Sequence, residues 1–388
     1  MIHQDCFTRK IYISTMKGKT ETGGSHEANL DFVRTLAVLM VVVSHLAFFF
    51  GVSTFSFLDP VLFGKLGVII FFVHSGIVNM LSIERHVNKY GERRLFRAFM
   101  TRRCFRIYPL SVVVVSVVFL MKLPVSLLAH HVAAIGQNAR AEFLPSLFLV
   151  QNFLRFDQIL SPLWSLPYEI QIYCLFPVAY LAIRRLRSTK TMVFAWSLLA
   201  MVDHVITPHF VKHANLGHFV TVPDFLSYSL LFGAGLYAFK EMQTSRRMVP
   251  FWALPALITI VCLMWCLSYG DTTKCVFVTF CLGLALPYIK GCSSTALNRV
   301  CGWVAKYSYG IYLLHFPAIW LAFVRCGHLP MVEKICIFVL ATLGTSVVAY
   351  HVIEHPMIVI GNRVAAAISK NEARPKGQAA AATAGAIG

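Results

Sequence analysis

Apolar runs of about 20 residues recur along this chain, and a run of that length can cross a bilayer as one helix. Hydrophobic residues make up 57% of the 388 residues and charged residues only 13%, and the mean hydropathy is +0.67. The sequence therefore predicts an all-α fold, a polytopic transmembrane helical bundle of about ten spans, rather than a string of soluble domains. The predicted spans are residues 30–50, 61–81, 105–122, 164–183, 190–207, 222–239, 249–268, 274–290, 307–325 and 334–354.

The placement of the basic residues predicts the orientation of these spans. A net charge of +18 could indicate nucleic acid, but the charges gather in alternate segments between the spans. With the N-terminus in the cytosol, the cytosolic segments hold 26 of the 35 Lys and Arg residues and the outer segments eight, while Arg34 lies within the first span. Cytosolic loops of membrane proteins carry this excess of positive charge. We therefore expect both termini in the cytosol, a multi-pass protein of the cytoplasmic (inner) membrane surrounded by lipids, and no nucleic-acid partner.

Three regions follow from this layout. We expect a polar cytosolic N-terminal segment at residues 1–29, the ten-span membrane domain at residues 30–356, and a cytosolic, disordered tail at residues 357–388. The tail is small and polar after Lys370. The first span is long and no small-residue cleavage pattern follows it, so we expect it to stay in the protein. Met1 and Met16 remain alternative starts of the chain.

The cysteines do not form a recognisable framework. All 11 are scattered, mostly inside predicted spans, and the sequence contains no CxxC pair and no HExxH pattern. Such cysteines are typical of small apolar packing residues. We expect neither disulfides nor a metal site.

Two ionisable residues share the first span, where a charged side chain costs on the order of 2.5–3.5 kcal/mol and therefore usually has a function. Arg34 and His45 are 11 residues apart. Eleven residues make about three helical turns, so both side chains lie on one face, about 16 Å apart along the axis. Alone, Arg34 could be an interfacial arginine reaching lipid phosphates, and His45 a histidine bonded to a neighbouring helix. Together on one face, they favour a functional site.

The segment SPLWSLPYEI contains a carboxylate at a similar depth. Trp164 is an interfacial aromatic at the outer boundary, and Glu169 lies five residues deeper. A buried carboxylate needs a partner, and it could orient the imidazole of His45 as the acid member of a triad does. A purely structural buried pair would give the same sequence pattern, so both interpretations stay open.

The basic run RRCFRIYP places Arg103 and Arg106 on one helical face just before the third span. These residues could simply keep this end of the span in the cytosol. Arginine forks also suit phosphate groups, which gives a phosphate-binding interpretation.

Four further residues could support a site. Ser75 in FFVHSG would need a base beside it to act as a nucleophile, and His74 points about 100° away around the helix. Close helix packing is therefore the simpler interpretation of this motif. His315 lies in the ninth span, and Glu354 lies at the cytosolic end of the tenth, where it could be a counter-ion of Arg34.

Taken together, these motifs resemble the integral-membrane acyltransferase family 3, the group of O-antigen and exopolysaccharide O-acetyltransferases. The resemblance extends from about residue 30 to residue 356, over the ten-span layout. His74 and Ile170 depart from the family pattern, which usually has an apolar residue and a second Glu at these positions. The matching motifs are Arg34 with His45, FFVHSG at 71–76, Arg103 with Arg106, the Trp-Ser-Leu-x-x-Glu of Trp164 to Glu169, and Ser308 to Pro317.

The resemblance implies transfer of an acyl group, usually acetyl, from cytosolic acyl-CoA to a hydroxyl of a surface glycan or lipid-linked saccharide. His45 would then act as general base, or itself accept the acyl group, and Glu169 would orient it. Arg34, Arg103 and Arg106 would bind the phosphates of acetyl-CoA or another acyl-CoA. The acceptor sugar and its position stay open, as do the oligomeric state and the formation of an acyl-enzyme.

Two other classes of protein would use some of these residues. A proton-coupled transporter or flippase of a cell-envelope precursor also places histidines and carboxylates in the membrane. Such transporters often carry paired, broken spans in two halves, a pattern that this sequence lacks. A structural subunit of a polysaccharide-export complex would not need Arg34, His45 and Glu169 together.

Overall fold

Helices make up nearly all of the described chain. The computed structural model describes residues 28–51, 59–123, 126–128, 131–133, 139–154, 156, 159–186, 188–213, 222–243, 245, 247–267 and 272–370. Each of the predicted spans falls on a helix or a helical pair. The described residues also contain one short antiparallel strand pair, β1 (Ser126–Leu128) with β2 (His131–Ala133), and an isolated parallel bridge between Val249 and Ile289.

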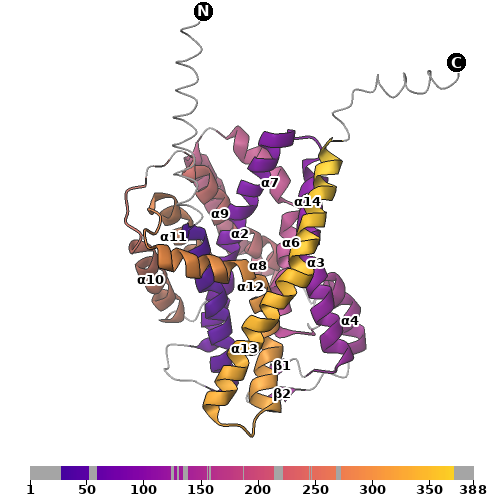
Figure 1. Ribbon diagram of the computed structural model, residues 1–388. Helices are drawn as coiled ribbons and strands as arrows, with labels where there is room; N and C mark the ends of the chain where they lie inside the picture. Colours follow the sequence, from indigo (N-terminus) through magenta and orange to yellow (C-terminus); the bar gives the residue numbers. More distant parts are fainter. Residues whose placement is uncertain are drawn as a thin grey trace, which may run out of the picture. The chain divides into compact units, whose positions relative to one another are not determined.

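Figure 1 shows the helices coloured in chain order. The first helix is Ala28–Phe49. The α-helices after it are α2 Pro60–Tyr90, α3 Leu95–Leu120, α4 Ala139–Phe148, α5 Gln151–Leu154, α6 Leu166–Tyr173, α7 Phe176–Arg185, α8 Thr189–His213, α9 Val222–Met242, α10 Ala253–Leu267, α11 Thr272–Ala285, α12 Thr295–Ile319, α13 Met331–Ala349 and α14 His355–Lys370. Two 3₁₀ turns, η1 Ser161–Ser165 and η2 Leu286–Tyr288, and two π-helical segments, η3 Trp320–Arg325 and η4 Tyr350–Glu354, complete them.

Five helices of the described chain are long and apolar enough to cross a bilayer. They are Ala28–Phe49, Pro60–Tyr90, Leu95–Leu120, Thr295–Arg325 and Met331–Lys370. A bent pair, Ser161–Tyr173 and Phe176–Arg185, forms a sixth if its two parts are one span with a bend of 50°. The structure therefore confirms an α-helical, multi-pass membrane protein. The total of ten spans stays a prediction, because α8, α10 and α11 contribute shorter apolar stretches.

The last helix extends past the predicted end of the membrane domain. Met331–Lys370 is continuous through η4, so helix continues beyond residue 356, and residues 371–388 lie outside the described part. The reason lies in packing: α14 lies along α3 (Figure 1). Any side chain at Gly361 would meet the ring of Phe105, and Ala365 is fully buried.

The chain divides into two compact units, each described here by itself. The first comprises residues 1–77, 193–208 and 227–312, and the second 78–192, 209–226 and 313–388. In the first unit, glycines let the helices approach closely. A Cβ at Gly67 would lie 2.7 Å from the Ala37 carbonyl oxygen of the first helix, and one at Gly76 would lie 2.8 Å from the Phe232 oxygen of α9. Small residues serve this purpose in membrane helices, where lipid removes the hydrophobic advantage of burial.

Candidate functional site

In the first unit, Arg34 is held by two helices. Its Nε–H donates a hydrogen bond of 2.6 Å to Ser308 Oγ on α12, and the Ser308 hydroxyl donates to the Ala305 carbonyl oxygen at 2.9 Å. The guanidinium carbon of Arg34 lies 5.8 Å from the centre of the Phe71 ring on α2, within cation–π range. The arginine is therefore positioned by contacts within the protein.

The same ring brings a histidine into this group. The rings of Phe71 and His74 are 5.9 Å apart, one turn along α2, and His74 is buried. We call Arg34, Phe71, His74 and Ser308 the Arg34 cluster. It joins three motifs that are far apart in the sequence: the start of the first span, FFVHSG and the segment around Ser308.

The first helix is anchored at the end that carries Arg34. The Thr35 hydroxyl donates to the Cys301 carbonyl oxygen at 3.0 Å, and the Asn29 amide donates to the carbonyl oxygens of Ile289 and Lys290 at 3.2 and 3.1 Å. His45 lies 11 residues after Arg34 on the same uninterrupted helix and is half-buried. Helical geometry therefore places His45 and Arg34 on one face, about 16 Å apart.

The FFVHSG segment is packed inside the first unit. Ser75 is 5% exposed, and Gly76 meets the backbone of α9 at Phe232 and Gly235. The glycine of this motif therefore serves close helix contact. A supporting role of Ser75 in the site stays a prediction.

In the second unit, Arg103 faces inward from α3. Its guanidinium carbon lies 5.1 Å from the ring centre of Phe99 and 5.7 Å from that of Tyr173 on α6, and the residue is 8% exposed. The Tyr173 hydroxyl donates a short hydrogen bond to Glu169 Oε1, and Glu169 is buried too. We call Phe99, Arg103, Glu169 and Tyr173 the Arg103 cluster.

The position of Glu169 suits a carboxylate. It stands in the first turn of α6, where the partial positive charge of the helix N-terminus stabilises an anion. Tyr173 follows four residues later, so the two side chains share a helix face. Tyr173 and Ser308 were not predicted as partners from the sequence, although the four-residue spacing could have indicated Tyr173.

The predicted pairs between His45 and Glu169, and between Arg34 and Glu354, join residues of different units. Within the second unit, Glu169 bonds with Tyr173, and within the first, Arg34 bonds with Ser308. Both pairings therefore stay predictions.

The other predicted residues lie in the second unit. Arg106 and Trp164 are half-buried, whereas His315 and Glu354 are buried. Glu354 ends the π-helical η4, where the His355 N–H donates to the Tyr350 carbonyl oxygen. His315 lies two residues before Pro317, which precedes the π-helical η3. Wide turns of this kind often occur at functional positions.

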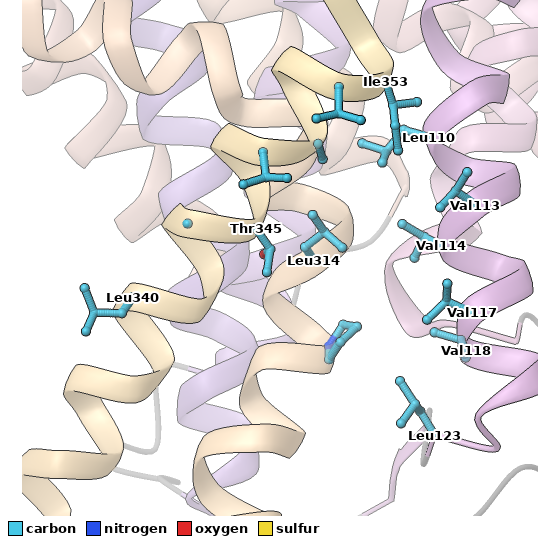
Figure 2. Close-up of a pocket in the computed structure, with 15 residues that line it drawn as sticks. Leu110, Val113, Val114, Val117, Val118, Leu123, Leu314, Leu340, Thr345 and Ile353 are labelled. Atoms are coloured by element: carbon cyan, nitrogen blue, oxygen red, sulfur yellow. The ribbon is translucent and has the colours of Figure 1, made fainter.

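An apolar groove of about 540 Å³ lies in the second unit, between α3, the end of α12 and the α13–η4 segment (Figure 2). Thr345 is its polar lining residue, and the Thr345 hydroxyl bonds to the Ala341 carbonyl oxygen of its own helix at 2.5 Å. The groove thus offers nothing to a phosphate or a sugar and suits hydrocarbon. It is lined by Leu110, Val113, Val114, Val117, Val118, Leu123, Leu314, Pro317, Leu340, Gly344, Thr345, Val348, Ala349, Val352 and Ile353.

Comparison with known families gives one extended match. A family model described as an acyltransferase domain matches residues 27–351, which includes both clusters and His45. No solved structure gives a significant match.

Three similar proteins carry related names. The putative peptidoglycan O-acetyltransferase YrhL of Bacillus subtilis is 25% identical over 370 residues, covering 86% of this chain and 55% of the relative. The peptidoglycan O-acetyltransferase OatA of Listeria monocytogenes is 25% identical over 339 residues, covering 79% and 51%. The acyltransferase MdmB of Streptomyces mycarofaciens is 25% identical over 330 residues, covering 77% and 79%. This chain spans about half the length of the first two relatives.

Proposed function

Because the chain belongs to the acyltransferase family whose model covers residues 27–351, we propose that it is a membrane-embedded O-acetyltransferase. Its donor is cytosolic acetyl-CoA, or another acyl-CoA, and its acceptor is a hydroxyl of a surface or lipid-linked glycan. Two relatives are named as O-acetyltransferases of peptidoglycan, which supports a glycan acceptor. The observation that carries the proposal is the Arg34 cluster. It brings three motifs of the chain together at the helix that also bears His45.

The proposed chemistry is general-base catalysis at His45. The imidazole takes the proton of the acceptor hydroxyl while the hydroxyl oxygen attacks the thioester carbonyl carbon. The tetrahedral intermediate collapses by breaking the carbon–sulfur bond, and the protonated imidazole returns the proton to the CoA thiolate. The products are the acetyl ester and free CoA, and His45 ends the cycle neutral.

In this proposal, Arg34 and His45 contact opposite ends of the CoA donor. The pantetheine arm of CoA is long and thin, of the same order as the separation of about 16 Å between these residues along the first helix. With Arg34 at the cytosolic end, as the positive-inside rule predicts, the arm follows the helix and brings the thioester to His45. Arg103 and Arg106 lie in the first half of α3, whose N-terminal end the same rule places at the cytosolic face.

Glu169 has a supporting role in this proposal. Its charge, held at the N-terminus of α6 and by the Tyr173 hydroxyl, stabilises a positive charge nearby. We propose that this positive charge is the imidazolium of His45 during transfer. The ten-span layout, with both termini in the cytosol and the chain in the inner membrane, belongs to the same proposal and rests on the positions of the basic residues.

The test is acetyl transfer in membranes that contain the wild type, His45→Ala or His328→Ala, with labelled acetyl-CoA and the native envelope glycan. His328 is an exposed histidine and serves as the matched control. We expect label in the glycan with the wild type and His328→Ala, and a loss of at least a hundredfold with His45→Ala at equal protein level.

Two results would contradict the proposal. Undiminished labelling by His45→Ala would move the base to another residue, with His74 and His315 next to be replaced. No labelling by any of the three proteins, with several acyl-CoA donors, would reject acyl transfer and favour the transporter, which envelope-precursor flux in vesicles would then measure.

A further inference from the structure

A second basic group lies at the α2–α3 hairpin, outside both clusters. His86 on α2 and Arg102 on α3 are in contact, with 3.2 Å between His86 Nδ1 and Arg102 Nη1. His86 is only 4% exposed. Arg102 opens the basic run RRCFRIYP, but neither it nor His86 has a role in the predicted site.

The chemistry of this contact fixes where the imidazole proton lies. Arginine can only donate, so Nδ1 of His86 accepts and the ring is neutral, with its proton on Nε2. Nε2 of His86 and Nη2 of Arg102 are both buried, and neither has a hydrogen-bond partner among the residues that the structure describes. The pair therefore presents three N–H bonds that need acceptors, beside a full positive charge. Buried donors of this kind are normally satisfied.

The surroundings favour an anion. Arg85 and Lys89 lie near the end of α2 and Arg97 near the start of α3, while Arg106 is one turn after Arg102 on α3. In contrast, Arg103 is turned toward Tyr173 and Glu169. Among the arginines of this hairpin, Arg102 is the one whose terminal Nη2 is buried without a hydrogen-bond partner in the described part of the chain.

We propose that His86 and Arg102 bind a phosphate monoester, and that this group is the 3′-phosphate of the CoA donor. A monoester carries a charge of about −1.5 to −2 and three strong acceptor oxygens, which match the three donors. The two bridging phosphates of CoA carry less charge each and fewer terminal oxygens. The inference rests on the proposed function, because it assumes the CoA donor.

Binding of CoA and dephospho-CoA to the full chain in lipid nanodiscs tests the site. The wild type should bind CoA at least tenfold more tightly than dephospho-CoA, which lacks the 3′-phosphate. In Arg102→Gln this ratio should fall to near one. Arg97→Gln removes the same charge from an exposed position of the same helix, and it should keep the wild-type ratio.

A second variant keeps the test valid if Arg102→Gln does not fold. His86→Leu with Arg102→Met removes all the buried donors together and replaces them with apolar groups, which preserves stability better than removing one partner. It should also lose the preference for CoA while its melting temperature stays at or above that of Arg102→Gln.

The possible results distinguish the 3′-phosphate site from the proposed CoA donor. Equal binding of CoA and dephospho-CoA by the wild type, or an unchanged ratio in Arg102→Gln, overturns the 3′-phosphate site alone. No binding of CoA by the wild type overturns the proposed donor as well. A lipid headgroup phosphate is the other source of this chemistry. If Arg102→Gln loses co-purifying phospholipid in native mass spectrometry but keeps the CoA ratio, the site belongs to lipid and the CoA assignment is wrong.

Discussion

The Arg34 cluster and the Arg103 cluster each hold an arginine against aromatic rings, but they balance its charge in different ways. Arg34 is half-buried and donates to a neutral hydroxyl, that of Ser308. Arg103 is buried between two rings, one of which belongs to the tyrosine that bonds to the Glu169 carboxylate. Charge balance in the Arg103 cluster thus depends on buried, mutually dependent groups, whereas Arg34 keeps access to solvent or to a ligand.

This difference separates structural from functional roles. Removing one member of a buried ion pair leaves the other charge buried without compensation. The resulting loss of stability is larger than the net stability that the intact pair contributes. A half-buried arginine on a hydroxyl can turn toward water when its partner is lost. We therefore expect variants at Arg103 and Tyr173 to lose mainly stability, and variants at Arg34 and Ser308 to lose mainly activity.

The largest loss of stability should come from Arg103→Met, because this substitution leaves the Glu169 carboxylate buried without its neighbouring cation. We expect the free energy of unfolding to fall by about 3–5 kcal/mol. Thermal unfolding in detergent measures it, with Arg97→Met as the exposed control on α3. Adding Glu169→Gln to Arg103→Met should recover part of the loss. If the double variant is no more stable than Arg103→Met, the two charges do not compensate each other.

Tyr173→Phe should cause the next largest loss of stability. It removes the hydroxyl that donates to Glu169 but keeps the ring under Arg103, so a loss of about 1–3 kcal/mol is expected. Chemical or thermal unfolding gives the value, and the comparison is Tyr108→Phe on α3, which removes a hydroxyl that donates to the Phe148 carbonyl oxygen at 3.0 Å. A loss equal to that of Tyr108→Phe would mean that the carboxylate acceptor adds little.

The smallest effect on stability should come from Ser308→Ala in the Arg34 cluster, at about 0.5–1.5 kcal/mol. Its effect on transfer should be larger, because Arg34 loses the contact that positions it. The check is to measure unfolding and acetyl transfer on the same preparation. A variant that is strongly destabilised, yet transfers normally per folded molecule, would reverse the comparison between the two clusters.

The sequence predicted the helices and the first-span site better than it predicted the partners. Apolar runs locate helices because the bilayer requires them, and the 11-residue spacing places Arg34 and His45 on one face of any helix. Which face of α3 turns inward depends on α2 and α6, so spacing alone could not tell that Arg103 meets Glu169 while Arg102 meets His86. Ser308 could not be predicted as the partner of Arg34 either, since 274 residues separate them.

The last helix also depends on a partner that is distant in the sequence. Residues 357–370 follow the last predicted span and are therefore expected in the disordered tail, although they include six large apolar residues. They form α14 because small residues, among them Gly361 and Ala365, let the helix lie directly on α3. That stabilisation comes from a partner more than 200 residues earlier in the chain, which local composition does not record.

The π-helical η4 determines how this last helix tolerates changes in length. At 3.6 residues per turn, Ala365 would lie about 100° around a continuous α-helix from Ser346, which is 19 residues earlier, yet both are fully buried. A π turn holds one additional residue, which cancels an offset of that size and brings the two side chains onto one stripe. Deleting a single residue between 350 and 354 would therefore convert the wide turn into an ordinary α turn and leave α14 facing α3. Inserting one there would rotate α14 by about 100° and turn Ala365 away from α3.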